Sequence, residues 1–113
     1  MSPATNSGLV VVVTYRVAAG NEARFETLLA RHTSTLRTLG LITDWPTRTL
    51  RRNHGGEAFY IEVFEWSSPD AADRASEVPE VIEIWEPMAA ACEERDGLPG
   101  LEFALFDGID PDT

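Results

Sequence analysis

Apolar and polar positions follow two different periods along this chain, and the order of these periods predicts the fold. Residues 9–17 are mostly β-branched and apolar, which is typical of a central strand. Gly20 and Asn21 end this strand, and apolar residues then recur at helical spacing as far as Leu39. Gly40 ends the predicted helix. The first part of the chain therefore reads as a strand followed by an amphipathic helix.

The middle of the chain predicts a β-hairpin. Residues 47–53 and 57–66 alternate in character on either side of Gly55 and Gly56, a pair that is typical of a two-residue turn. Such a turn places Leu50 opposite Ile61. The register then predicts one face with Leu50, Phe59, Ile61 and Val63, and another with Thr49, Arg51, Tyr60, Glu62, Phe64 and Trp66.

The last third of the chain predicts a helix in two pieces and a final strand. Residues 71–78 form a short helical piece, and Pro79 begins a second piece with an apolar face. Trp85 has core spacing on this face, with lining of a pocket as the alternative. Residues 101–106 alternate again, which predicts the last strand.

The element order predicts an α+β, ferredoxin-like β-α-β-β-α-β sandwich with a four-stranded antiparallel sheet. A length of 113 residues fits one domain, 1–113, with an ordered core of about 9–106 and short polar tails. Two helices can cover only one face of the sheet. We expect that face to carry Val11, Val13, Leu50, Phe59, Ile61, Val63, Leu101, Phe103 and Leu105.

The opposite face would then expose Val10, Val12, Tyr60, Phe64, Trp66 and Phe106. An apolar patch of this kind exceeds what most monomers tolerate, so we expect a homodimer that pairs sheet to sheet. Polar side chains on the same face would point into the dimer interior. Burying them without partners is costly, so each must meet another polar group, water or a ligand. They are Thr14, Arg16, Arg51, Glu62 and Glu102.

Glu62 is the main candidate for chemistry, and two readings of it stay open. Arg51 is its diagonal neighbour across the hairpin, and an ion pair between them would be structural. If Glu62 faces an apolar cavity instead, it is a candidate general base.

Composition excludes several partners. The net charge of −10 argues against nucleic acid and anionic membranes, because these need clustered cations. Residues 1–8 do not resemble a signal peptide, and the run 9–13 is too short to cross a bilayer, so we expect a cytoplasmic protein. Neither His32, which fits a satisfied core or rim histidine, nor His54 has metal-ligand spacing with Cys92. We therefore expect no metal.

Four segments carry a resemblance to a known family: 10–15, 20–22, 64–69 and 84–88. Together they resemble the small antibiotic-biosynthesis-monooxygenase-like proteins of the dimeric α+β barrel superfamily. The resemblance spans about residues 9–106 and implies a homodimer paired through its sheets. The superfamily includes cofactor-independent oxygenases, haem-degrading enzymes, isomerases, cyclases and members without known activity. Many members carry a histidine near the start of the second helix, where this chain has residues 75–77, Ala-Ser-Glu, so that residue does not carry over.

Two functions are consistent with this resemblance. The first is a monooxygenase-like oxidoreductase that needs no cofactor and binds a flat, partly apolar small molecule in a sheet-lined cavity, although haem binding stays open. The second is a non-catalytic small-ligand-binding or accessory dimer. In the first, Glu62 or Tyr60 moves a proton while Arg51 and Arg16 hold an oxyanion or carboxylate. The remaining expected contacts are Thr14, Phe64, Trp66 and Trp85.

Overall fold

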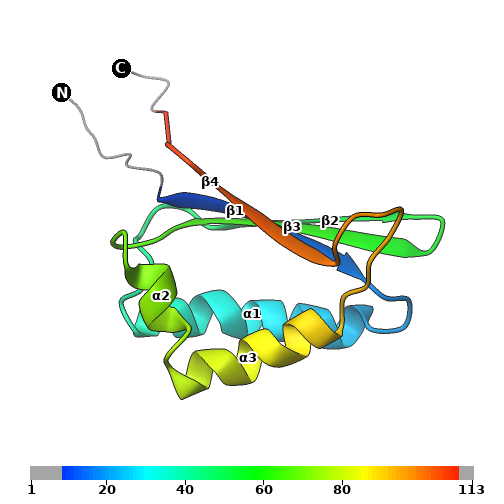
Figure 1. Cartoon of the computed structure of the whole chain (residues 1–113), viewed down its shortest axis with the longest axis horizontal. Helices are drawn as coiled ribbons and strands as arrows, with labels where there is room; N and C mark the ends of the chain where they lie inside the picture. Colours follow the sequence, from blue (N-terminus) through cyan, green and yellow to red (C-terminus); the bar gives the residue numbers. More distant parts are fainter. Residues whose placement is uncertain (1–8, 110–113) are drawn as a thin grey trace.

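The structure is a computed structural model and describes residues 9–109. Helices cover one side of a single sheet (Figure 1). The predicted tail 1–8 and residues 110–113 of the predicted C-terminal tail lie outside the described residues. The elements are β1 (Val10–Val17), α1 (Glu22–Thr38), β2 (Arg48–His54), β3 (Glu57–Glu65), α2 (Ala71–Ala75), α3 (Pro79–Ala90) and β4 (Leu101–Phe106).

The predicted fold class is confirmed. The four strands pair antiparallel in the order β2-β3-β1-β4, so β1 and β3 are central and β2 and β4 are edges. The hairpin register is also as predicted, with Leu50 opposite Ile61. Gly55 and Gly56 have φ angles of 62° and 84°, which a two-residue turn requires and glycine adopts without strain.

The predicted assignment of faces is correct for β1 and β4 and wrong for the hairpin. Val13 lies directly opposite both Phe103 of β4 and Glu62 of β3, and directly opposed residues point to the same face. The hairpin residues of β3 that were expected on the open face therefore lie on the face that the helices cover. They are Tyr60, Glu62, Phe64 and Trp66, all of them buried. The hairpin turn fixes the register of β2 with β3 but not the pairing between β1 and β3. That second pairing decides which face of the hairpin the helices cover.

The core lies between this face of the sheet and the helices. Phe25 and Leu36 of α1 and Val81 of α3 are fully buried against it. Pro79 starts α3 at a position where its missing N–H costs nothing. Within residues 9–109, no helix is both long enough and apolar enough to cross a membrane.

Backbone contacts fix the start of β4. Arg16 N donates to Gly100 O at 2.7 Å, and Glu93 N donates to Arg16 O at 2.8 Å. The segment after α3 is thereby tied to β1 just before β4 begins. From that point β4 runs along the edge of the sheet, and its Phe103 and Leu105 side chains are 67% and 56% exposed.

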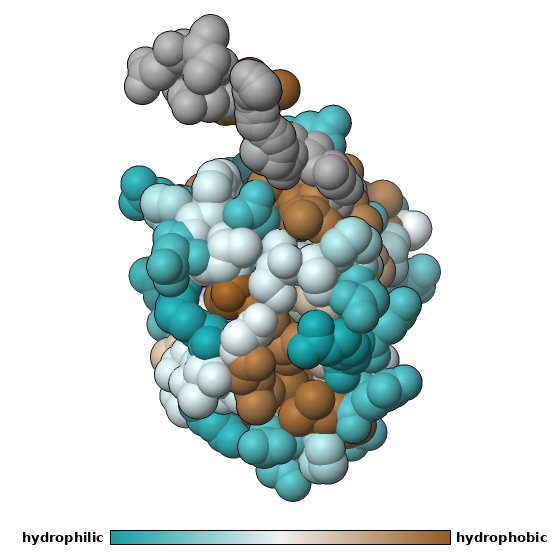
Figure 2. Space-filling model, turned by 90° about the vertical axis from the view of Figure 1, so that its left-hand side faces the viewer, coloured by the Kyte–Doolittle hydropathy of each residue, from teal (hydrophilic) through white to brown (hydrophobic). Residues whose placement is uncertain are grey.

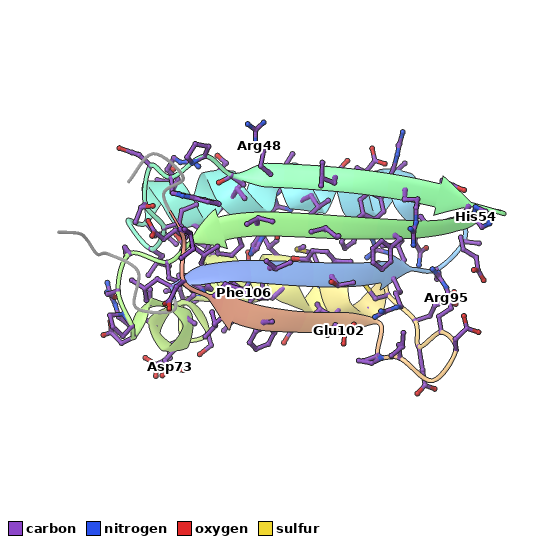
Figure 3. All side chains as sticks on the ribbon, turned by 90° about the horizontal axis from the view of Figure 1, so that it is seen from above. Arg48, His54, Asp73, Arg95, Glu102 and Phe106 are labelled. Atoms are coloured by element: carbon purple, nitrogen blue, oxygen red, sulfur yellow. The ribbon has the colours of Figure 1, made fainter. Side chains whose placement is uncertain are left out.

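Within residues 9–109, no element packs on the other face of the sheet (Figure 3). Apolar side chains lie along its central strands, and Leu50 on the β2 edge is 59% exposed. An open apolar face was predicted. Val12 lies on it as predicted, whereas the hairpin contributes Phe59, Ile61 and Val63 in place of the predicted Tyr60, Phe64 and Trp66.

Candidate active site

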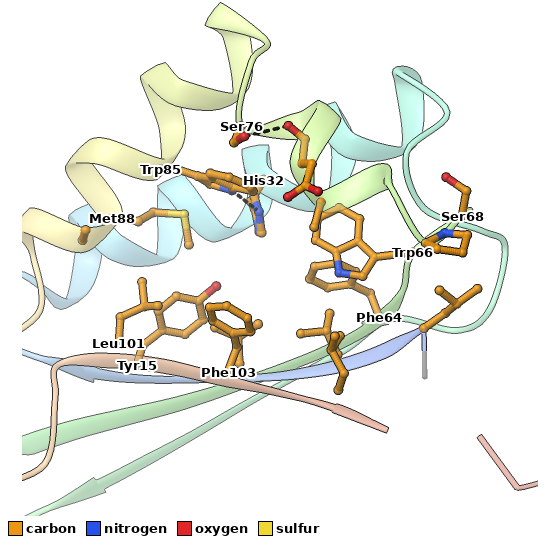
Figure 4. Close-up of a pocket in the computed structure, with 18 residues that line it drawn as sticks. Tyr15, His32, Phe64, Trp66, Ser68, Ser76, Trp85, Met88, Leu101 and Phe103 are labelled. Atoms are coloured by element: carbon orange, nitrogen blue, oxygen red, sulfur yellow. Dashed lines mark hydrogen bonds between the residues drawn. The ribbon is translucent and has the colours of Figure 1, made fainter. Parts of the chain in front are cut away.

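A largely apolar pocket of about 670 Å³ lies between the helices and the covered face of the sheet (Figure 4). We expected a cavity between two sheets of a dimer, whereas this pocket is formed within one chain. At the end of the molecule that carries α2, apolar surface shows between polar side chains (Figure 2). The lining residues are Leu9, Val11, Val13, Tyr15, His32, Phe64, Trp66, Ser68, Pro69, Ala72, Asp73, Ser76, Trp85, Met88, Ala89, Leu101, Phe103 and Leu105.

Glu62 lies directly behind the wall of this pocket and is completely buried. The Tyr15 hydroxyl donates to Glu62 Oε1 at 2.7 Å. His32 Nδ1 is 3.1 Å from both carboxylate oxygens. Tyr15 and His32 line the pocket themselves. The carboxylate is therefore connected to the pocket through two neutral side chains.

Trp85 defines the tautomer of His32. Trp85 Nε1 donates to His32 Nε2 at 2.8 Å (Figure 4). An indole N–H can only donate, so Nε2 is the unprotonated nitrogen. Nδ1 then carries the proton and donates it to Glu62. The result is a chain of donors that runs from Trp85 through His32 to the carboxylate.

Tyr15 is held as a neutral phenol. Burial, followed by the charge of Glu62 and the hydrogen bond to it, raises the pKa of Tyr15 well above its ordinary value of 10.0. The hydroxyl has one proton, which it donates in the hydrogen bond to Glu62. Toward the pocket, the Tyr15 oxygen can therefore only accept a hydrogen bond.

The predicted aromatic contacts Phe64, Trp66 and Trp85 all line the pocket. Glu62 lies one layer behind it. Tyr60 points elsewhere, because its hydroxyl donates to Glu26 Oε2 of α1 at 2.6 Å.

Of the two readings of Glu62, the ion pair with Arg51 is wrong. Arg51 Nη1 instead contacts Glu26 Oε2 at 2.7 Å. Arg51 lies on the exposed edge strand β2, where α1 offers a half-exposed carboxylate within reach. Glu62 is sealed by α1 and β1, and neutral donors satisfy it.

Arg16 and Thr14 lie on the open face of the sheet, away from the pocket. Arg16 Nη1 contacts Pro99 O at 2.7 Å and Glu102 Oε1 at 2.9 Å. Arg16 lines a second hollow, together with Arg52 and Arg95. None of the nine arginines is among the described residues that line the pocket.

No local sequence pattern predicts that Tyr15 and His32 meet Glu62. Tyr15 continues the period-two series of Val11 and Val13, and His32 lies on the apolar face of its helix. These are the signals that the sequence contains. Connecting them to Glu62 requires the register between β1 and β3, which pairs Val13 with Glu62.

Within residues 9–109, no cluster of three or more His, Cys, Asp or Glu side chains is arranged to hold a metal ion. Cys92 of the segment after α3 is part-buried, and burial raises its pKa to about 11. Its thiol donates to Met88 O at 3.3 Å. Cys92 is therefore a protonated packing residue at neutral pH.

No protein-family model and no curated protein matches this chain. Solved structures do. SnoaB, a cofactor-independent oxygenase from Streptomyces nogalater, has 21% identity and a TM-score of 0.66 over 92% of this chain and 96% of that chain. This chain shares its fold. A putative antibiotic biosynthesis monooxygenase from Caulobacter crescentus CB15 has 14% identity and a TM-score of 0.64, covering 90% of each chain.

A third similar structure is a dimeric ferredoxin-like protein of unknown function from Jannaschia sp. CCS1. It has 14% identity and a TM-score of 0.57 over 88% of this chain and 98% of that chain. The predicted resemblance is thus confirmed for the ferredoxin-like α+β fold. Proteins with this fold include oxygenases and proteins without a known activity, so function has to be argued from the site.

Proposed function

We propose that the protein binds a flat, electron-rich aromatic molecule in the pocket and removes a proton from it through Tyr15 to Glu62. One observation carries this proposal: a buried carboxylate, bonded only to neutral donors in the part of the chain described, lies behind the hydroxyl of a residue in the pocket wall. Aromatic side chains of the pocket, among them Phe64 and Trp66, suit a flat ligand.

The proton path follows from the hydrogen bonds. A phenol or enol hydroxyl of the ligand donates to the Tyr15 oxygen, and Tyr15 passes its own proton to Glu62 Oε1. Tyr15 then holds the ligand's former proton and donates it back to the oxyanion as a hydrogen bond. His32 Nδ1 continues to donate to the Glu62 carboxyl group. No net charge enters or leaves the site in this step.

The resulting anion is rich in electrons and can reduce dioxygen itself. In the overall reaction, a ring CH₂ group becomes a carbonyl with one oxygen atom, and the second oxygen leaves as water with the two hydrogens. Electrons come from the ligand, so the reaction requires no bound cofactor. The similarity in fold to SnoaB, described as a cofactor-independent oxygenase, supports this chemistry. Tyr60 has no part in it, because its hydroxyl is bonded to Glu26.

A specific observation favours a second function, the binding of a ligand without chemistry. Both nitrogens of His32 and both oxygens of Glu62 already have hydrogen-bond partners inside the protein. A fully satisfied network of this kind is also consistent with a purely structural role, in which it stabilises the core.

Anthrone separates these two functions. It is a flat three-ring molecule whose enol form carries one hydroxyl, and its oxidation to anthraquinone consumes one dioxygen and releases one water. We expect catalysed anthraquinone formation above the spontaneous rate. The variants Tyr15→Phe and Glu62→Gln should lower the catalysed rate roughly 10²–10⁴-fold, the usual range for loss of general-base catalysis.

Tyr60→Phe is the matched control, because it removes a tyrosine bonded to a different glutamate and should leave the rate unchanged. Anthrone that binds without being oxidised would support the non-catalytic function. If anthrone does not bind at all, both functions assigned to this pocket are wrong.

We also propose that two copies pair through the open face of the sheet. Ile61 and Val63 of the central strand β3 lie there with Val12 of β1, and no element among the described residues covers them. The dimeric description of the Jannaschia protein supports this arrangement. Native mass spectrometry should show a dimer at micromolar concentration, and a monomer would contradict the proposal.

A further inference from the structure

The pocket has a negatively charged side chain, Asp73, and no positively charged arginine among the described residues that line it. Asp73 of α2 is the only acidic or basic side chain, apart from His32, among the described residues that line it. Its carboxylate is exposed and has no ion pair within residues 9–109. The neighbouring Arg74 pairs with Asp70 at 4.0 Å instead, and neither of these residues lines the pocket.

A second negative charge lies deeper in the protein. Glu62 accepts from Tyr15 and His32, and no cation contacts it in the described part of the chain. The walls between the two carboxylates are largely apolar. An apolar wall screens charge less than water does, so a charged ligand inside the pocket experiences both carboxylates.

Asp73 lies at one end of the pocket. Figure 3 shows it at the end of the molecule that carries α2. Ser76, whose hydroxyl donates to the main-chain oxygen of Asp73 at 2.6 Å, lies on the helix side of the pocket in Figure 4, whereas Tyr15 and Leu101 lie on the sheet side. A ligand that places its hydroxyl at Tyr15 can therefore extend the rest of its body toward α2.

We propose that Asp73 selects the ligand by charge: the pocket accepts aromatic hydroxyl compounds that are neutral or carry a protonated amine at the α2 end, and it rejects those that carry a carboxylate or phosphate. This inference rests on the proposed function, because it assigns the substrate class of the same pocket. It replaces the expectation that arginines hold an anionic group of the ligand.

Three probes with one ring system test the inference. They are naphthol, a hydroxynaphthoate and an (aminomethyl)naphthol, which carry a neutral, a negative and a positive substituent. Isothermal titration calorimetry at low ionic strength gives the three affinities. We expect the amine to bind at least as tightly as naphthol, and the carboxylate to bind roughly tenfold more weakly than naphthol, which is the size of one charge interaction of about 1.4 kcal/mol.

Asp73→Asn should change the two charged probes in opposite directions. The affinity for hydroxynaphthoate should rise and that for the amine should fall, each about three- to tenfold, while naphthol changes little. Because Asp73 is exposed, added salt should shrink both effects. Asp70→Asn is the matched control, since it removes an aspartate that is near in sequence but does not line the pocket.

The outcomes separate the two proposals. If naphthol binds and the two charged probes bind equally well, or if hydroxynaphthoate binds most tightly, the selection by Asp73 is wrong. The proposed function is unaffected by these outcomes. The same holds if Asp73→Asn shifts all three affinities together. If none of the three probes binds, the pocket is not a site for aromatic hydroxyl compounds, and both proposals are wrong.

Discussion

Tyr15 and Tyr60 lie directly opposite each other on β1 and β3, and each donates its hydroxyl proton to a glutamate. Tyr15 bonds to Glu62 at 2.7 Å and Tyr60 bonds to Glu26 at 2.6 Å. The two pairs differ in what else surrounds the carboxylate. Glu62 is buried and meets the neutral His32, whereas Glu26 is half-exposed and meets Arg51.

This difference determines which pair is suited to move a proton. The hydrogen bond from Tyr60, followed by that from Arg51, lowers the pKa of Glu26 below its ordinary value of 4.5. Glu26 therefore stays ionised and its pair with Tyr60 is structural. Glu62 has no such cation among the described residues, and the Tyr15 oxygen faces the pocket. A tyrosine–glutamate pair can thus have a structural role at one place and be suited to proton transfer at another.

Phe25 separates the two pairs, and removing it should have the largest effect on stability. Its ring centroid is 4.8 Å from that of Tyr15 and 4.9 Å from that of Tyr60, and its side chain is fully buried. Phe25→Ala should lower the free energy of unfolding by about 3–5 kcal/mol, the usual cost of such a cavity. Urea denaturation measures this change. Leu98→Ala, at an exposed position of the loop before β4, is the control, and an equal loss there would contradict the central role of Phe25.

The ionisation of the two tyrosines should distinguish the pairs at alkaline pH. Burial, followed by Glu26, raises the pKa of Tyr60 to about 12, and the pKa of Tyr15 is also raised well above 10.0. Because both folded-state pKa values lie above those of the unfolded chain, this contribution to stability is complete below about pH 10 and is lost as the pH rises. Ultraviolet titration should show no tyrosinate near pH 10 in the folded protein.

The variant Tyr60→Phe leaves Tyr15 as the only tyrosine, since the chain has two. Its tyrosinate should form only well above pH 10 or coincide with unfolding. A tyrosinate signal near pH 10 from this folded variant would contradict the buried Tyr15–Glu62 bond.

Loss of the exposed Glu26–Tyr60 pair should have the smallest effect on stability, and this effect should depend on pH in the acid range. The folded-state pKa of Glu26 is lowered, so its contribution to stability is present above about pH 4.5 and is lost as the pH falls through the lowered value. Glu26→Gln should be less stable than the wild type at neutral pH, and the difference should shrink below pH 4.5. Urea denaturation at several pH values measures it. A stability difference that keeps the same size at every pH would count against the structural role of the Glu26–Tyr60 pair.

Much of the fold could be predicted from the sequence. The Gly55-Gly56 turn set the hairpin register, and the spacing of apolar residues gave the order of the elements. The inward face of β3 could not be predicted in the same way, because both of its alternating sets contain large apolar residues. The position of Glu62 in one of these sets made that set look like the face left uncovered by the helices.

The candidate site could be predicted only in part, for a related reason. Phe64, Trp66 and Trp85 were recognisable as aromatic residues near strand ends or on an apolar helix face, and they do line the pocket. A buried glutamate, in contrast, depends on donors from other elements. Tyr15 and His32 are 47 and 30 positions away from Glu62 in the sequence, so no local pattern reveals them.

Gly100 constrains how the pocket of this protein can diversify. A Cβ atom at this position would lie 2.8 Å from Glu93 N and 3.0 Å from Cys92 Cβ, closer than side chains normally approach. Only glycine therefore fits there without displacing β4. Homologues with a differently shaped pocket are expected to exchange the side chains at positions 103 and 105 and to keep both the glycine and the path of the strand.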